Sequence, residues 1–353
     1  MSLSRYLLAA SATAALAVLA FAPLPAQATP SAAKLSTKSV NGFQDEVSCL
    51  STKLCVLAGY NNFGTGDVVA VRNGTPGHVS VVSKTSRLYN VSCPSASGCV
   101  ALADPSSGVG AEFVKINSSG VVTSAKVVKD PAGDTINEIS CTKLTSCEVA
   151  GTNIFSTPWK IVTGTWNGKT LSLRTISAPK GTNSTSVLGL SCSGGTCDVV
   201  GYSTSATKVI GLSLTAAGTR LGRLHTANGD SLYGVSCVSK STCYAAGFGA
   251  VEGLVVTIKN GVIGSPRKTL SDLAGIACGG SQCTAVGTIS ALPSSGDINW
   301  GTLVSVSAGK VTGSANVKPS FSLDGVARLG SFFTAIGASQ ARKGEPPSEV
   351  VTN

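Results

Sequence analysis

Carboxylate, amide and aromatic side chains gather a few residues before a cysteine motif that the chain repeats. Carboxylate oxygens bind cations and accept hydrogen bonds from sugar hydroxyls, and two carboxyl groups can together hydrolyse a glycosidic bond. Asp and Asn also initiate turns, so polar loops arise without any ligand. Both interpretations stay open here. The candidates are Asp45, Glu46, Tyr89, Asn90, Glu138, Asp230, Tyr233 and Asp324, with Asp134 and Asp272 at comparable places.

Two tryptophans in longer loops form a second group of candidates. Trp159 ends the stretch 151–159, and Trp300 ends the stretch 287–300. An aromatic ring in such a loop can stack on a sugar, or it can cap the rim of the fold. The sequence leaves these two roles open.

The elements that must position these residues are repeats with two cysteines each. The clearest copy, Val235–Gly247, runs apolar-small-Cys, then a short polar loop, then Cys-x-apolar-apolar-Gly. A seventh copy, Val326–Gly337, has Arg328 and Phe333 at the cysteine positions. The joint loss of both cysteines predicts disulfides within each repeat rather than between repeats. The predicted pairs are Cys49 with Cys55, Cys93 with Cys99, Cys141 with Cys147, Cys192 with Cys197, Cys237 with Cys243 and Cys278 with Cys283.

The spacing of the copies predicts the architecture. A period of roughly 40–50 residues indicates a solenoid, a propeller or an array. Each copy contains the two strands of the motif, a third strand that ends at a turn such as Asn73-Gly74 or Asn260-Gly261, and a fourth strand. Four short antiparallel strands without a helix form a propeller blade. Seven copies therefore predict an all-β protein, a seven-bladed β-propeller.

The ends of the repeat array predict a closed ring. Glu349–Asn353 matches a third strand, after which the last copy lacks its fourth strand, and a spare strand precedes the first copy at Lys34–Val40. An open solenoid would need polar capping repeats, which we do not find. We expect the N-terminal strand to complete the last blade in an antiparallel pairing.

Residues 1–28 have the pattern of a secretory signal peptide. Arg5 precedes the apolar stretch Leu7–Phe21, and Ala26-Gln-Ala28 is a small-x-small cleavage site. A retained anchor is the alternative. We expect cleavage after Ala28, which leaves residues 29–353 as one propeller domain without a membrane span. A secreted, extracellular location would also let the cysteines oxidise.

Composition and charge exclude several classes of function. Of 353 residues, 42% are apolar and 12% charged, which argues against a disordered chain. The net charge of +10 is spread along the sequence, so it fits an anionic cell-wall polymer or a membrane as partner, or solubility alone. The basic residues are not interleaved with aromatic ones, so nucleic acid is not expected.

The two histidines, His78 and His225, fall on or beside fourth strands, away from the channel, which argues against a Ser-His-Asp triad. We expect a monomer with no metal and no cofactor.

The chain resembles a family of secreted repeat proteins that are common in actinobacteria. The similarity lies in the Cys-pair motif and in the stretch Thr165–Leu173, which contains Trp166-Asn-Gly168. It covers about 40–353, although the Trp-Asn-Gly turn is intact only at this one place. The resemblance to these Cys-pair/WNG-repeat proteins implies a secreted β-propeller and carries over no catalytic residue.

In a propeller the first strands line a central channel, so loops that lead into them surround its mouth. The sequence therefore favours a secreted binding or scaffold module, with glycans or other cell-surface molecules as ligands. The alternative is a carbohydrate-active hydrolase that uses the acidic pair Glu46 and Glu138 at the channel mouth.

Overall fold

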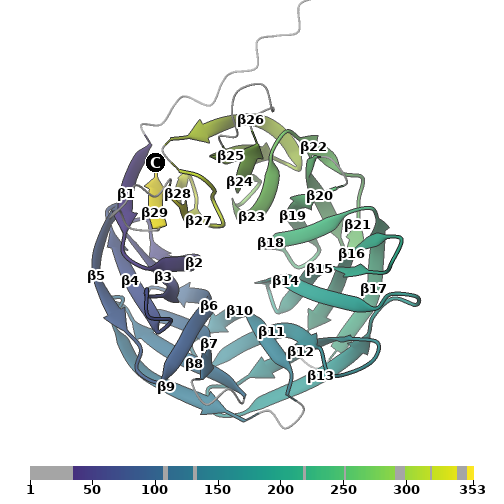
Figure 1. Cartoon of the computed structure of the whole chain (residues 1–353), viewed down its shortest axis with the longest axis horizontal. Helices are drawn as coiled ribbons and strands as arrows, with labels where there is room; N and C mark the ends of the chain where they lie inside the picture. Colours follow the sequence, from purple (N-terminus) through teal and green to yellow (C-terminus); the bar gives the residue numbers. More distant parts are fainter. Residues whose placement is uncertain are drawn as a thin grey trace, which may run out of the picture.

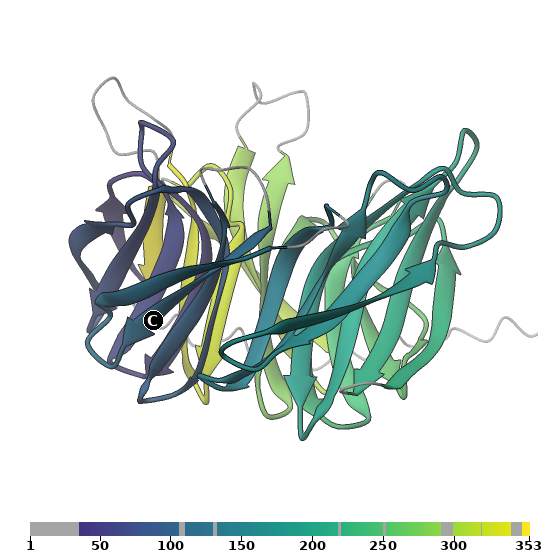
Figure 2. The ribbon, with the colours of Figure 1, turned by 90° about the horizontal axis from the view of Figure 1, so that it is seen from below.

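Seven antiparallel sheets surround an open centre like the blades of a propeller (Figure 1), and they form a ring of limited height when seen from the side (Figure 2). This computed structural model describes residues 35–105, 110–129, 133–217, 220–249, 252–290, 299–318, 320–339 and 348–353. The all-β, seven-bladed prediction is confirmed. No helix in the described ranges could cross a bilayer. The predicted signal peptide, residues 1–28, lies outside them.

Each blade runs outward from the channel in chain order. The first strands are β2 (Phe43–Ser51), β6 (Thr85–Ser95), β10 (Thr135–Lys143), β14 (Ser184–Ser193), β18 (Ser231–Ser239), β23 (Asp272–Gly279) and β27 (Gly325–Leu329). The second strands are β3 (Leu54–Tyr60), β7 (Gly98–Pro105), β11 (Ser146–Asn153), β15 (Thr196–Thr204), β19 (Thr242–Phe248), β24 (Gln282–Ser290) and β28 (Phe332–Ala338). The third strands are β4 (Gly66–Arg72), β8 (Ala111–Asn117), β12 (Lys160–Trp166), β16 (Val209–Ala217), β20 (Gly253–Lys259), β25 (Asn299–Ser307) and β29 (Ser348–Thr352).

The outer strands differ more than the inner ones. Blade 5 has two short pieces, β21 (Val262–Ile263) and β22 (Arg267–Thr269), which both pair with β20. Blade 7 takes its outer strand from the other end of the chain. The outer strands of the other blades are β5 (Thr75–Val81), β9 (Val122–Val128), β13 (Leu171–Ser177), β17 (Arg220–Asn228) and β26 (Lys310–Val317).

The predicted closure of the ring is confirmed. Strand β1 (Ser36–Val40) pairs antiparallel with β29, with Ser36 opposite Thr352 and Val40 opposite Ser348. Figure 1 shows the two strands side by side, β1 in purple and β29 in yellow. Val40 is buried in the core between blades 7 and 1. The pairing joins the two ends of the repeat array and covers an edge strand that would otherwise be open to association.

The core is divided among the seven interfaces between neighbouring blades. Seven clusters of buried apolar side chains each draw on two adjacent blades. In blade 1, β3 and β4 are buried on both faces, whereas β5 is largely exposed. A strand buried on both faces must be apolar at nearly every position. This explains the continuous apolar run after the second cysteine of each repeat.

All six predicted disulfides are present within their repeats, between first and second strands. Each closes a short loop, so the chain-entropy model gives about 2 kcal/mol apiece. In blade 7, Arg328 and Phe333 lie opposite each other where the other blades have cysteines. The Arg328 guanidinium donates through Nη1 to Thr284 Oγ1 at 2.5 Å, which ties blade 7 to blade 6.

A belt of serine hydroxyls connects neighbouring blades around the channel. The residue before the first cysteine is small in every repeat, and in five blades it is a serine whose Oγ accepts a hydrogen bond from the cysteine N–H of the next blade. Blades 6 and 7 have Ala277 and Ala327 at this position, so the belt is interrupted on both sides of blade 7. The bonds join Cys93 N to Ser48 (3.0 Å), Cys141 N to Ser92 (2.9 Å), Cys192 N to Ser140 (3.2 Å), Cys237 N to Ser191 (2.9 Å) and Cys278 N to Ser236 (3.0 Å).

Removing β1 should open the ring. A chain that begins at Asn41 loses the strand that covers β29, so we expect a lower melting temperature and association through the exposed edge. A chain that begins at Leu35 keeps β1 and serves as the matched control. Differential scanning fluorimetry and light scattering measure the two effects. Equal melting temperatures and monomeric behaviour for both chains would contradict the closure.

The serine belt can be tested in both directions. Ser92→Ala leaves the Cys141 N–H without its acceptor and should lower the free energy of unfolding by about 1 kcal/mol. Ala277→Ser offers an acceptor where the belt is interrupted, and we expect it to raise stability. Ser124→Ala, on the exposed outer strand β9, is the control. Urea denaturation measures all three, and equal midpoints for Ser92→Ala and Ser124→Ala would refute the belt.

Candidate functional site

The first strand of six blades carries one residue more than its partner strand can pair. In blade 1, Gln44 lies opposite Gly59 and Glu46 lies opposite Ala58, which leaves Asp45 unpaired in a β-bulge. The same shift occurs in the first strands of blades 2 to 6. A bulge re-aims the side chains beside it. It therefore sets which two residues of each first strand face the mouth of the channel.

In blades 1 and 3 to 6, the glycine that ends the cysteine motif makes room for the bulged first strand. A Cβ on Gly59 would lie 1.9 Å from the Phe43 carbonyl oxygen of the first strand, which no side chain tolerates. The close approach brings the first strand against the second and leaves no room for a side chain there. In blade 2, Ala103 occupies this position, and the first strand has a further register shift between Thr85 and Arg87. A Cβ would lie 2.0 Å or less from a first-strand carbonyl oxygen in the same way at Gly151, Gly201, Gly247 and Gly287.

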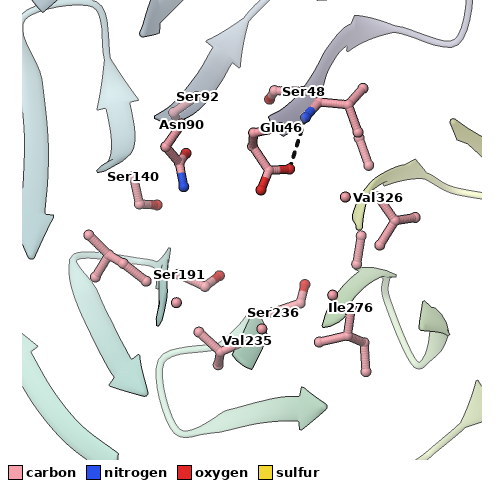
Figure 3. Close-up of a pocket in the computed structure, with 18 of the residues that line it drawn as sticks. Glu46, Ser48, Asn90, Ser92, Ser140, Ser191, Val235, Ser236, Ile276 and Val326 are labelled. Carbon is pink, nitrogen blue, oxygen red and sulfur yellow. Dashed lines mark hydrogen bonds between the residues drawn. The ribbon is translucent and has the colours of Figure 1, made fainter. Parts of the chain in front are cut away.

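The channel mouth opens into a cavity of about 300 Å³ whose two sides differ. Blades 1 to 3 contribute Glu46, Asn90 and Glu138, three positions before their first cysteines. Figure 3 shows the Glu46 and Asn90 side chains directed into the open centre. At the same position the other four blades have only glycine: Gly189, Gly234, Gly275 and Gly325. At this position one side of the mouth thus offers side-chain oxygens, and the facing side has no side chain.

The two carboxyl groups of the mouth interact with each other. Glu138 is 9% exposed, and its oxygens accept hydrogen bonds from Asn90 Nδ2 at 2.9 Å and Asn137 Nδ2 at 3.2 Å. Burial, reinforced by repulsion from Glu46, raises the Glu138 pKa well above its usual value. Burial likewise raises the pKa of Glu46 to about 7. The hydrogen bond that Glu46 Oε1 accepts from Val47 N–H at 2.9 Å lowers this pKa, but by less than burial raises it. The mouth therefore holds two coupled carboxyl groups that retain protons at unusually high pH.

The rim beside this acidic side carries an ion pair among aromatic rings. Arg87 donates from Nε and one terminal nitrogen to both oxygens of Asp45, each at 2.8 Å. The same guanidinium lies 5.1 Å from the ring centre of Tyr60 and 5.2 Å from that of Tyr89. Tyr89 in turn donates its hydroxyl to Asp104. Both Asp45 and Tyr89 are held by neighbours, and neither lines the cavity.

A second aromatic group lies across the mouth on blades 4 and 5. Tyr233 lines the cavity and stacks on Phe248 with ring centres 5.3 Å apart, and Tyr202 lies 6.2 Å on its other side. Asp230 is half-buried in the loop just before this strand. The carboxyl pair and this aromatic group thus come from different blades around one opening.

The structure places most of the predicted candidates inside the first strands, whereas we expected them in the loops that lead there. Asp45, Glu46, Tyr89, Asn90, Glu138 and Tyr233 belong to β2, β6, β10 and β18, because the bulge extends strand pairing past them. Asp324 lies at the cavity just before β27. Trp159 precedes β12, and Trp300 lies in β25 with Lys318 Nζ 4.0 Å from its ring centre. Neither tryptophan lines the cavity.

The sequence pattern did not indicate several residues of the mouth. Asn137 holds Glu138 and also donates to the Val187 carbonyl of the next blade at 3.0 Å. Arg87 neutralises Asp45, and Phe248 completes the aromatic group. A signal for the bulge was present in the sequence. Apolar residues recur five and two positions before the first cysteine, as in Leu88 and Val91, and an odd spacing cannot keep both on one face of a regular strand.

Comparison with known proteins identifies the fold and no more. Neither a protein-family model nor a curated protein matches the chain. Among solved structures it is similar to the WD40 repeats of RRP9, with 11% identity, a TM-score of 0.55 and coverage of 90% of this chain and 96% of that one. YCF48 bound to D1 peptide shares 11% identity, with a TM-score of 0.56 and coverage of 90% and 96%. The WD40 propeller domain of Doa1 shares 10%, with a TM-score of 0.58 and coverage of 91% and 97%. The chain is a disulfide-paired β-propeller.

The Glu46 pKa predicts how stability depends on pH. Between the ordinary value of 4.5 and about 7, the folded protein keeps a proton that the unfolded chain releases, so the free energy of unfolding falls as pH rises. Glu46→Gln removes the titrating group, and with it this contribution to the pH dependence of the free energy of unfolding. We expect the variant to match wild type at pH 4 and to exceed it by about 3 kcal/mol at pH 8.

Urea denaturation across this pH range measures the effect, with Asp272→Asn as an exposed control. If Glu46→Gln and wild type keep the same difference in stability at every pH, the carboxyl group is not perturbed by its surroundings.

Proposed function

We propose that the protein is a secreted binding module whose ligand is a glycan held at the channel mouth. The observation that carries the proposal is the two-sided cavity, with acceptor groups of Glu46 and Glu138 on one side and glycines at the same position of the other four blades. A carboxyl group offers sugar hydroxyls an acceptor oxygen with or without its proton, and the glycine side leaves room for a bulky ring. Tyr233, stacked on Phe248, offers an aromatic face for the apolar side of a sugar.

Secretion is supported by the six disulfides and by the signal-like residues 1–28. Disulfides form and persist in oxidising compartments, and every cysteine of the chain is paired. The resemblance to secreted Cys-pair/WNG-repeat proteins points the same way. We therefore place residues 29–353 outside the cell as one domain.

A carbohydrate-active hydrolase is the second candidate. The observation that favours it is the coupled pair of carboxyl groups, because glycoside hydrolysis needs one protonated acid beside one carboxylate. The hydrogen bonds on both Glu138 oxygens favour a binding role instead, since they leave this side chain little freedom to transfer a proton.

A glycan array followed by calorimetry tests the proposal. We expect the chain from residue 29 to retain a defined group of glycans, and Glu46→Ala and Tyr233→Ala each to weaken binding about tenfold or more, because each removes a contact of about 1–2 kcal/mol. Trp300→Ala is the matched control, since it removes an aromatic ring that does not line the cavity.

Three outcomes would count against the glycan proposal. The first is that no glycan is retained, and the second is that Trp300→Ala weakens binding as much as Tyr233→Ala does. The third is that peptides alone are retained, which would match the propeller YCF48, whose solved structure is bound to D1 peptide. Mass spectrometry of the retained glycans tests the second candidate. Cleavage products that disappear in Glu138→Gln would establish hydrolysis.

A further inference from the structure

The face of the ring opposite the channel mouth is basic. Because the strands of each blade alternate in direction, the disulfide hairpin loops and the turns between third and fourth strands share this face, here called the disulfide face. None of these loops and turns contains Asp or Glu. Arg72 is exposed there together with six lysines: Lys53, Lys143, Lys169, Lys240, Lys259 and Lys310.

The basic residues are grouped in pairs on alternate blades. In blade 1, Lys53 lies in the disulfide loop and Arg72 beside the next turn, and Asn73 N–H donates to the Lys53 carbonyl at 2.9 Å, which connects the two loops. Blade 3 has Lys143 and Lys169 at the corresponding places, and blade 5 has Lys240 and Lys259. The pairs are thus fixed by the blade scaffold and distributed around the ring.

Acidic groups near this face do not neutralise it. Asp198 follows a second cysteine but is buried, and its Oδ1 accepts hydrogen bonds from Ser213 and Thr215, each at 3.3 Å. Glu148, at the corresponding place in blade 3, is half-buried and already has a partner. The mouth face is different, because acids and bases mix there and pair, as Asp45 does with Arg87.

The side chains of the disulfide face indicate which polyanion fits. Lysine acts as a point charge that binds phosphate without a fixed geometry, whereas arginine predominates where planar groups are recognised. The strongly exposed aromatic residues, such as Phe63 at 93% and Phe155 at 76%, lie in loops between second and third strands, on the mouth face. Among the described residues of the disulfide face, Phe332 of the blade 7 hairpin is half-buried, and the exposed apolar residues Val121, Val262 and Leu329 lie on three different blades. This face therefore offers little for the stacking of nucleotide bases or for entry into a bilayer.

We propose that the disulfide face binds a flexible hydrophilic polymer that carries a phosphate in each repeat unit. Such a polymer can bend around the ring and meet the pairs on blades 1, 3 and 5 in turn. The charge complementarity is long-ranged and falls with salt. Bound in this way, the protein directs its channel mouth away from the polymer, so the two faces can be occupied together.

Linear polyphosphate is the probe, and fluorescence anisotropy between about 50 and 200 mM salt gives the affinity and its salt dependence. The test variant combines Lys53→Gln, Lys143→Gln and Lys240→Gln. We expect at least a tenfold loss of affinity at low salt, and a decrease of about 2 in the slope of log affinity against log salt, which corresponds to three lost phosphate contacts on a flexible strand. Melting temperature checks that each variant is folded.

The matched control changes the same net charge on the other face, with Lys129→Gln, Lys180→Gln and Lys208→Gln, all exposed. It should leave the slope nearly unchanged. An equal loss in both triple variants would show that only total charge matters and would overturn the proposal. Tighter binding of a single-stranded oligonucleotide with the same number of phosphates, or of vesicles rich in anionic lipid, would overturn it in favour of nucleic acid or membrane.

Discussion

The extra residue in the first strand of six blades determines the geometry of the channel mouth. A regular strand would turn every second side chain toward the channel, and the bulge instead presents two consecutive positions there. In blade 1 these are Asp45, which pairs with Arg87 on the rim, and Glu46, which lines the cavity. The bulge also presses the first strand against Gly59 of the second. In blade 1 the glycine of the motif and the acids at the mouth thus lie at the same backbone irregularity.

Much of the architecture could be predicted because the same pattern of strands and cysteines recurs along the chain, so that each copy supports the interpretation of the others. The loss of both cysteines at Arg328 and Phe333 indicated pairing within a repeat, and the strand left over at Lys34–Val40 indicated how the ring closes. Both predictions are confirmed. The environment of the site was harder to predict, because it depends on contacts between repeats. No local pattern shows that Asn137 of blade 3 donates to Glu138 and also to blade 4.

The two faces of the ring carry different chemistry on one scaffold. Strand order places the strand ends that hold Tyr233 and Phe248 on one face and the disulfide loops on the other. The disulfides stabilise the hairpins that display Lys53 and Lys240, so short polar loops without a core of their own still hold their shape. Between the faces, the serine belt and the buried second and third strands hold the blades in register. The proposed glycan site and polymer site can then change independently.

The central claim is that the fold keeps two interacting carboxyl groups partly desolvated at the channel mouth. Their titration can be followed directly by NMR of the chain with carbon-13 in the glutamate carboxyl groups, assigned through Glu46→Gln and Glu138→Gln. We expect a midpoint near 7 for Glu46 and a midpoint for Glu138 well above its ordinary value, and we expect the Glu138 midpoint to fall when Glu46 is replaced. Independent titration of both groups close to the ordinary value of 4.5 would contradict it.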